Sequence, residues 1–256
     1  MYMTFKSAYS SRVEMYINPI ILDRKERIDN FSIYIITLPK RMNYVKNMIK
    51  KYKLQEICNV KIVDAVLKKD INLNDSFTKK IVSIDKLNNR LKKSVNQSIL
   101  GQLGCYMSHL KVFDIFMNKD RNDNLLVLED DFIFEKGVDV YSFKRIINKL
   151  INENLKYDII NIGPCWRNCK KDNIQNINNY LTKDFGKCTH SLLTNKRGIN
   201  NILKYMYPID MALDDKYDYL TSNRFIIGYS LINRLFDQNS KLESNIQSRT
   251  LTPKCV

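Results

Sequence analysis

Short apolar runs alternate with amphipathic stretches along most of this chain. The first run, Phe31 to Leu38, is nearly continuous and rich in isoleucine, which is typical of a strand buried on both faces of a sheet. In residues 40–53 the apolar side chains recur at helical spacing, and lysines fill the other side. A second apolar run extends from Asn59 to Val66. This succession predicts a strand, a helix and a strand at the beginning of an α/β sheet.

The same alternation continues toward the C-terminus. From Gly101 onward the apolar positions share one helical face, and residues 141–154 and 196–205 also predict helices. Three further strands are predicted: Asn124 to Leu128, Asp158 to Ile162, and Arg224 to Tyr229. Residues 68–96 predict a loop with a short helix. The Asn- and Ser-rich residues 232–256 predict a tail that wraps around the domain rather than packing into it.

Neither an internal repeat nor a linker rich in Gly, Ser or Pro divides the chain, so we predict one α/β domain. Residues 1–30 would be an N-terminal extension, residues 31–245 the domain, and residues 246–256 a C-terminal tail. A chain of 256 residues can bury a sizeable core without disulfides or metals. A hydrophobic content of 44% excludes a disordered chain.

The charge of the chain raises the question of a polyanionic partner. Lys and Arg total 42 against 27 Asp and Glu, a formal net charge of +15, and such a field attracts nucleic acids or anionic membranes. However, the basic residues are spread over nearly every segment instead of clustering with aromatic residues. An AT-rich genome would also enrich Lys, Asn and Ile. We therefore predict no nucleic-acid partner, keep a basic nucleic-acid-binding protein as the alternative, and leave peripheral membrane contact open.

The cysteines and the N-terminus bear on where the protein works. The six cysteines are few and unevenly spaced, so they do not predict a disulfide framework. No signal peptide and no apolar run of about 18 residues is seen, and we expect a cytoplasmic protein in a reducing compartment, with a viral origin left open. Four side chains offer an alternative zinc site, although their spacing differs from the common two-residue knuckle. They are Cys165, Cys169, Cys188 and His190.

The strongest chemical signal is the segment from Leu125 to Phe132, LLVLEDDF. Glu129, Asp130 and Asp131 follow an apolar strand directly, and three adjacent like charges are costly unless a cation neutralises them. Ligands of open α/β sheets bind at the carboxyl ends of the strands. Hard carboxylate oxygens suit Mg²⁺ or Mn²⁺, which hold phosphates. The segment therefore predicts a divalent metal that carries a diphosphate, with an acidic turn as the structural alternative.

Three motifs in this order resemble glycosyltransferase family 25, the lipooligosaccharide and procollagen galactosyltransferases. The first strand is followed by a basic turn, here Thr37-Leu38-Pro39-Lys40-Arg41. A G-x-x-G-C-x-x-S-H segment comes next, and an L-E-D-D motif follows at residues 128–131. The second motif is matched at Gly101, Gly104, Cys105, Ser108 and His109. The resemblance covers about residues 32–245, and it is weaker after residue 188.

The resemblance implies a nucleotide-binding fold of the glycosyltransferase A type, in which a mixed sheet is flanked by helices. It implies Mn²⁺ or Mg²⁺ and a UDP-hexose donor, with galactose or glucose transferred to a glycan, a lipid-linked or a collagen-like acceptor. Asp131 would be the main metal ligand, with Glu129 and His190 in the same shell, and Glu129 or Asp130 would face the ribose or the metal. Other residues expected around the donor are Thr37, Leu38, Lys40, Arg41, Gly101, Ser108 and His109.

The family is expected to invert the anomeric centre, which requires a general base on the acceptor hydroxyl. Asp210 and Asp214 in the segment PIDMALDD are the candidates, whereas Asp215 reads equally well as part of a solvated helix start. His109 and His190 can each be read instead as a hydrogen-bonded histidine of the core. An inactive domain that only binds partners remains a further alternative, and the oligomeric state stays open.

Overall fold

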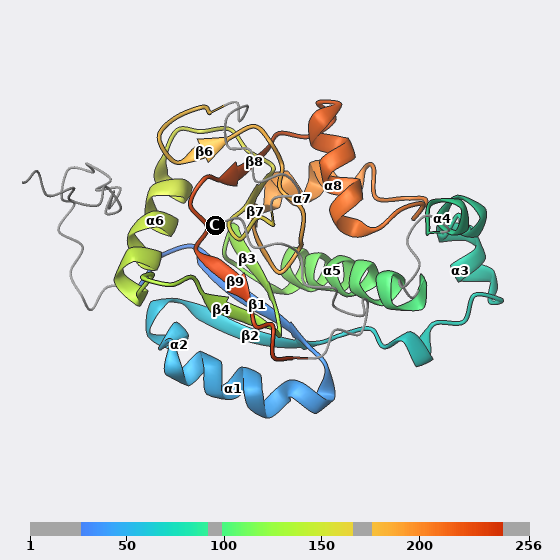
Figure 1. Ribbon diagram of the computed structural model, residues 1–256, viewed down its shortest axis with the longest axis horizontal. Coiled ribbons are helices and arrows are strands. Elements are labelled where there is room, and N and C mark those ends of the chain that lie inside the picture. Colours follow the sequence, from blue (N-terminus) through green and yellow to red (C-terminus); the bar gives the residue numbers. More distant parts are fainter. Residues whose placement is uncertain (1–26, 92–98, 166–175, 243–256) are drawn as a thin grey trace, which may run out of the picture.

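The structure is a computed structural model, and it describes residues 27–91, 99–165 and 176–242. Most of the predicted N-terminal extension, the tail from residue 246 and Cys169 lie outside these residues. The described part is built on a seven-stranded sheet in the order β2-β1-β3-β7-β5-β8-β6 (Figure 1). Its strands are β1 (Phe31–Thr37), β2 (Asn59–Asp64), β3 (Asn124–Glu129), β5 (Ile159–Asn161), β6 (Leu181–Thr182), β7 (Ser191–Asn195) and β8 (Gly228–Leu231).

The sheet is mixed, with one strand reversed near its centre. β1 pairs in parallel with both β2 and β3, whereas β7 runs antiparallel to β3 and to β5. β8 is parallel to β5, and β6 is antiparallel to β8. A separate antiparallel pair joins β4 (Phe132–Phe134) to β9 (Phe236–Gln238). The prediction of an α/β fold with a mixed sheet flanked by helices is therefore confirmed.

Helices pack on both faces of the sheet, and the alternation of side chains along the central strands explains why. Ile33 and Ile35 of β1 point into one core, while Tyr34 and Ile36 point into the other. The first core is covered by α1 (Met42–Lys51), α2 (Leu54–Ile57) and α6 (Val140–Asn152). The second is covered by α4 (Ile84–Leu91), α5 (Ile99–Lys119), α7 (Lys196–Leu203) and α8 (Leu213–Ser222).

Two regions differ from the expectations. Residues 68–91 form more helix than the single short one predicted: η2 (Lys68–Asp70), α3 (Ser76–Ile81) and α4. The prediction that residues 232–256 form an unpacked tail is wrong for its first part, because β9 pairs with β4. Phe236 is fully buried against aromatic rings of β4 and α6. Burial of this ring outweighs the polar composition of its neighbours.

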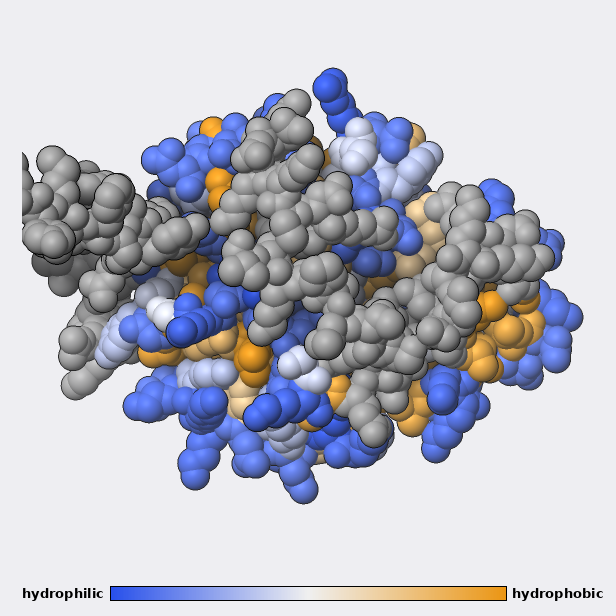
Figure 2. Space-filling view, viewed as in Figure 1, coloured by the Kyte–Doolittle hydropathy of each residue, from blue (hydrophilic) through white to orange (hydrophobic). Residues whose placement is uncertain are grey.

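Where the surface in Figure 2 is coloured by hydropathy, it is mostly hydrophilic, with smaller hydrophobic areas between the hydrophilic side chains. None of the helices in the described parts of the chain is both long and apolar enough to cross a bilayer.

Candidate active site

The three consecutive carboxylates lie where β3 ends, beside the turn that follows β1. The two strands are parallel and are paired from Phe31 with Asn124 to Ile36 with Glu129, so both leave the sheet at the same edge. The reversed strand β7 begins at this edge, where Ser191 faces Leu128. The edge thus gathers three segments that are far apart in the sequence. It is the place where open α/β sheets bind their ligands.

Asp130 ties the end of β3 to the turn after β1. Its carboxylate accepts hydrogen bonds from the backbone N–H of Leu38 at 2.8 Å and from Thr37 Oγ1 at 3.4 Å. Arg41 Nη1 lies 2.5 Å from Asp130 Oδ1, and both side chains are nearly buried. A charge-assisted pair with little water around it holds its geometry well. The structure therefore brings together four predicted site residues, Thr37, Leu38, Arg41 and Asp130.

Glu129 is the centre of a second polar group. Its Oε1 accepts a hydrogen bond from Thr189 Oγ1 at 2.6 Å and lies 3.2 Å from His109 Nε2. The sulfur of Cys105 is 3.8 Å from the same oxygen. Burial by itself would raise the pKa of Glu129, but the hydrogen bonds from His109 and Thr189 and the charge of His109 lower it. Glu129 is therefore held in its ionised form.

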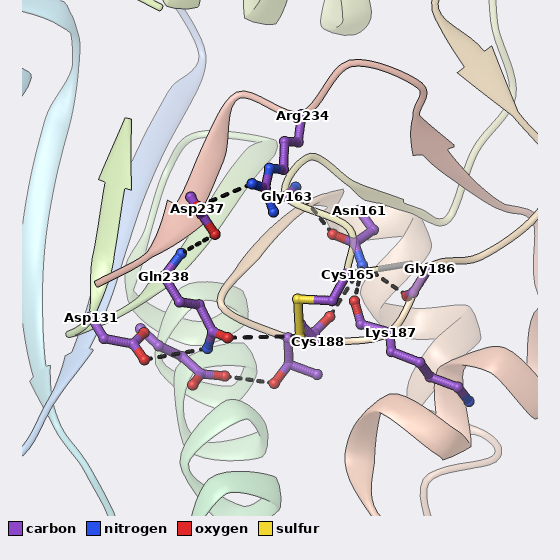
Figure 3. Close-up of a disulfide and its surroundings, with 12 residues drawn as sticks. Asp131, Asn161, Gly163, Cys165, Gly186, Lys187, Cys188, Arg234, Asp237 and Gln238 are labelled. Carbon is purple, nitrogen blue, oxygen red and sulfur yellow. Dashed lines mark hydrogen bonds and ion pairs between the residues drawn. A yellow bond between two sulfur atoms is a disulfide. The ribbon is translucent and has the colours of Figure 1, made fainter. Parts of the chain in front are cut away.

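Asp131 is nearly buried, and the segment around β9 reaches it. Gln238 Nε2 donates to Asp131 Oδ2 at 3.3 Å, as Figure 3 shows, and the Asn239 N–H donates to the Asp131 carbonyl at 2.7 Å. Gln238 is a neutral amide, and its contact is one of the interactions of the Asp131 carboxylate. The Asp130 carboxylate lies in an ion pair with Arg41.

The two candidates for the general base, Asp210 and Asp214, have different surroundings. Asp210 lies in an ion pair with Lys216, at 3.1 Å, and Asp215 in one with Lys187, at 2.8 Å. Asp214 accepts from the backbone N–H of Asp215 at 2.9 Å. Burial raises the pKa of Asp214, and the negative charge of Asp215 raises it further. Such a carboxylate accepts a proton more readily than an ordinary aspartate does.

Asp214 also lies on the same side of the molecule as Glu129. Burial, Glu129 and Asp214 all raise the pKa of the Cys105 thiol, which shows that both carboxylates act on this one sulfur. The backbone N–H of Cys188 hydrogen-bonds Asp214, and Cys188 immediately precedes the Thr189 that contacts Glu129. Segment 188–189 thus lies between the candidate base and the carboxylate cluster.

Three other predicted residues have different surroundings. Lys40 is exposed in η1 (Pro39–Arg41). Gly101 is buried within the first turns of α5. Ser108 donates to the carbonyl of Gly104 at 2.5 Å and accepts from the N–H of Val66 at 2.8 Å. A methyl group on Gly104 would lie 2.7 Å from the Val66 carbonyl. Gly104 and Ser108 therefore allow α5 to pack closely against the loop after β2.

His190 and two of the predicted zinc-site cysteines lie together. Cys165 and Cys188 form a disulfide, which the uneven spacing of the cysteines did not predict (Figure 3). The reason is topological: Cys165 follows β5, Cys188 precedes the neighbouring strand β7, and an antiparallel bridge joins Cys165 to Lys187. His190 is fully buried. Burial lowers its pKa, and Glu129 partly opposes this effect.

Metal-ligating atoms within 4.8 Å of one another form two groups in the described ranges. One is Cys105, His109 and Glu129, and the other is Cys165, Cys188 and His190. The predicted set of Asp131, Glu129 and His190 is not gathered to this distance among those residues. Carboxylate oxygens at Glu129 and Asp131 still match the donors that Mn²⁺ and Mg²⁺ prefer.

The sequence reasoning missed Thr189, Asn161 and Gln238. Asn161 is fully buried, and its amide donates to the carbonyls of Gly186, Lys187 and Cys188 at 2.9–3.2 Å (Figure 3). These bonds fix residues 186–188, which we call the strap before β7. A polar residue at the end of the apolar strand DIINI was a signal for Asn161. Gln238 had none, because its segment had been assigned to a tail.

A comparison with known protein families identifies the family of the chain. The family model of glycosyltransferase family 25, described as an LPS biosynthesis protein family, matches residues 30–217. The chain therefore belongs to glycosyltransferase family 25, as the motifs implied.

Individual relatives are distant. Procollagen galactosyltransferase 2 of Homo sapiens is 27% identical over 199 residues, which cover 73% of this chain and 30% of that protein. The chain thus spans less than a third of the length of this galactosyltransferase. NAD(+) hydrolase TirS of Staphylococcus aureus (strain MSSA476) is 20% identical over 230 residues, or 75% of this chain and 78% of that protein. Among solved structures, a protein from STIV matches with a TM-score of 0.39 and 13% identity, covering 79% of this chain and 82% of that one.

Proposed function

We propose that this chain is a metal-dependent glycosyltransferase that moves a hexose, galactose or glucose, from a UDP-sugar to a hydroxyl group of an acceptor. The observation that carries the proposal is the cluster at Glu129, Asp130 and Asp131, which lies at the carboxyl edge of a sheet in a member of a glycosyltransferase family. A glycan, a lipid-linked saccharide or a collagen-like chain would be the acceptor. The galactosyltransferase relative supports this choice.

The carboxylates would divide the work of donor binding. Asp131 and Glu129 would hold Mn²⁺ or Mg²⁺, and Asp130 would keep the turn of Leu38 and Arg41 in place through its buried ion pair. When bound, the metal supplies positive charge that stabilises the diphosphate leaving group. His109 and Thr189 hold Glu129 ionised and oriented, which a metal ligand requires. His190 belongs with the cysteines and is not part of this proposed set.

The transfer itself would be a single displacement. The acceptor oxygen forms a bond to the anomeric carbon while the bond from that carbon to the UDP oxygen breaks, so the configuration inverts. The acceptor proton passes to Asp214, whose raised pKa suits a proton acceptor and which Lys216 does not neutralise as it does Asp210. Lys40, exposed in the turn after β1, would attract the diphosphate.

A screen of nucleotide substrates tests this proposal. Purified protein is incubated with Mn²⁺ and UDP-galactose, UDP-glucose or NAD⁺, and the products are separated by chromatography and identified by mass. We expect UDP to be released from at least one UDP-hexose, and more of it when saccharide acceptors are added. Cleavage of NAD⁺ alone would instead favour the activity for which the staphylococcal relative is named. A protein that binds UDP but turns over no donor would support the inactive alternative.

A further inference from the structure

The disulfide and His190 form a cluster separate from the carboxylates. Cys165 follows β5, while Cys188 and His190 precede and abut β7. The two sulfur atoms and a ring nitrogen of His190 lie within 4.8 Å of one another. Figure 3 shows the disulfide between the strap that contains Lys187 and the segment that contains Gln238. The proposed transferase reaction uses none of these three side chains.

His190 is the feature of this cluster that needs an explanation. Its side chain is fully buried, and within residues 27–91, 99–165 and 176–242 neither ring nitrogen meets the geometry of an ordinary hydrogen bond, although the backbone of Phe236 acts on the ring. A buried polar group that is this poorly satisfied costs free energy, and an ion that binds there or a redox role accounts for such exceptions. A methyl group on Gly163 would lie 2.5 Å from His190 Nε2, so this nitrogen faces the turn that leads to Cys165.

The backbone keeps the two cysteines adjacent without help from the disulfide. The N–H of Cys165 donates to the Lys187 carbonyl at 2.9 Å, and the N–H of Lys187 donates back at 3.0 Å. Asn161 holds the same strap through three carbonyls. Reduction would therefore leave two thiols next to a buried imidazole.

We propose that reduction of the Cys165–Cys188 disulfide creates a binding site for Zn²⁺, with Cys165, Cys188 and His190 as ligands. The disulfide takes up two electrons and two protons from a dithiol, which is oxidised to its own disulfide. Binding of Zn²⁺ then displaces the two thiol protons and leaves two thiolates and one neutral imidazole on the metal. This soft donor set suits Zn²⁺, whereas the carboxylates nearby suit hard cations.

The fourth ligand of a tetrahedral site would come from Gln238 or from water. The Gln238 Oε1 atom lies 3.8 Å from Cys188 Sγ, and its Nε2 donates to Asp131. A metal that recruits Gln238 would therefore act on the side chain that contacts Asp131. The zinc site itself does not depend on the transferase proposal, because its three ligands are outside the proposed reaction.

Measurement of bound metal before and after reduction tests the site. Oxidised protein and protein reduced with a phosphine are each equilibrated with Zn²⁺, passed over a desalting column and analysed by mass spectrometry of the metal. Co²⁺ replaces Zn²⁺ in a parallel sample, because tetrahedral thiolate coordination gives it a visible absorption band. We expect one additional Zn²⁺ per reduced chain, and a thiolate-to-cobalt band that the oxidised chain lacks.

Variants distinguish this site from other cysteines. Cys165→Ser and His190→Gln should each lose the additional Zn²⁺, whereas Cys105→Ser and Cys58→Ser should keep it. Cys105→Ser is the matched control, because Cys105 belongs to the other group of candidate ligands. Cys165 is half-buried in a β-bridge, so Cys165→Ser keeps the test open if His190→Gln does not fold. Equal zinc content in oxidised and reduced protein, or zinc retained by folded Cys165→Ser, would overturn the proposal.

Discussion

Carboxylates lie near both ends of the paired strands β1 and β3, and the two ends are built differently. Near the amino ends, Asp120 accepts hydrogen bonds from Ser32, Tyr34, Lys61 and the Asn122 backbone at 2.9–3.1 Å. This single charge is surrounded by donors from four positions. It fastens α5 and the first strands together.

At the carboxyl ends, three adjacent carboxylates have donors of a different kind. Asp130 has a cationic partner, Glu129 has a histidine and a threonine, and the contact of Asp131 with Gln238 is to a neutral amide. The three carboxylates at this edge are consecutive in the sequence, and this concentration of negative charge is what supports the proposal of a bound cation.

The largest expected effect comes from removing the charge at the carboxyl end. Asp131→Asn should lower kcat for UDP release by about 100- to 1,000-fold, because the leaving group loses electrostatic stabilisation. The melting temperature should stay near that of the wild type. Asp237→Asn is the matched control, since Asp237 lies one residue before Gln238 in an ion pair with Arg234 and should leave kcat unchanged. Similar rates for both variants would remove Asp131 from the reaction.

The pH dependence of kcat/KM tests Asp214. A base must be deprotonated to act, so the rate should rise with pH through the pKa of Asp214, and this acid limb should lie above that of an ordinary aspartate. Asp214→Asn should lower the rate by about 100-fold or more and remove the limb. Asp215→Asn should stay active and shift the limb to lower pH, because the repulsion that raises the pKa of Asp214 is lost. If the acid limb of the pH profile persists in Asp214→Asn, another group is the base.

The opposite end should respond in stability and not in rate. Asp120→Asn should lower the free energy of unfolding by about 2 kcal/mol, as the loss of a charge-assisted hydrogen bond does, and the melting temperature by about 4–8 °C. Asp114→Asn, on the exposed side of α5, is the control and should change neither. A loss of kcat in folded Asp120→Asn would contradict the division between the two ends.

Acid should weaken the wild type at this position. Burial opposes ionisation of Asp120, but the hydrogen bonds from the Asn122 N–H and from Lys61 lower its pKa below the usual value. A carboxyl whose folded-state pKa is depressed adds stability above its unfolded pKa and loses it as the pH falls through the folded-state pKa. Acid titration of the unfolding free energy should therefore show a smaller loss in Asp120→Asn than in the wild type.

A smaller effect is expected at His109. In His109→Gln the charge that lowers the pKa of Glu129 is gone, so Glu129 should take up a proton at higher pH than in the wild type. Because a metal ligand must be ionised, the affinity for Mn²⁺ in the presence of UDP should fall by about tenfold at acidic pH and less at neutral pH. Titration calorimetry at two pH values measures this difference. An equal loss at both values would indicate a packing defect instead.

The features that are contiguous in the sequence could be predicted from it. β1, β3 and the acidic residues after β3 are local patterns, and parallel pairing places the ends of the two strands at one edge. The partners of Glu129 and Asp131 could not be predicted in the same way, because Thr189 and Gln238 arrive through the antiparallel strand β7 and the short pair of β4 and β9. The bond between Cys165 and Cys188 likewise depends on a pairing across 23 positions.

Binding of UDP in the presence of Mn²⁺, measured by titration calorimetry, tests the difference between the two ends most directly. The wild type and Asp120→Asn should bind UDP with the same affinity at a temperature where both are folded, and removal of Mn²⁺ should weaken binding in both. Asp131→Asn should show no metal-dependent binding. If Asp131→Asn binds UDP with Mn²⁺ as the wild type does, the carboxyl end of β3 is not the donor site.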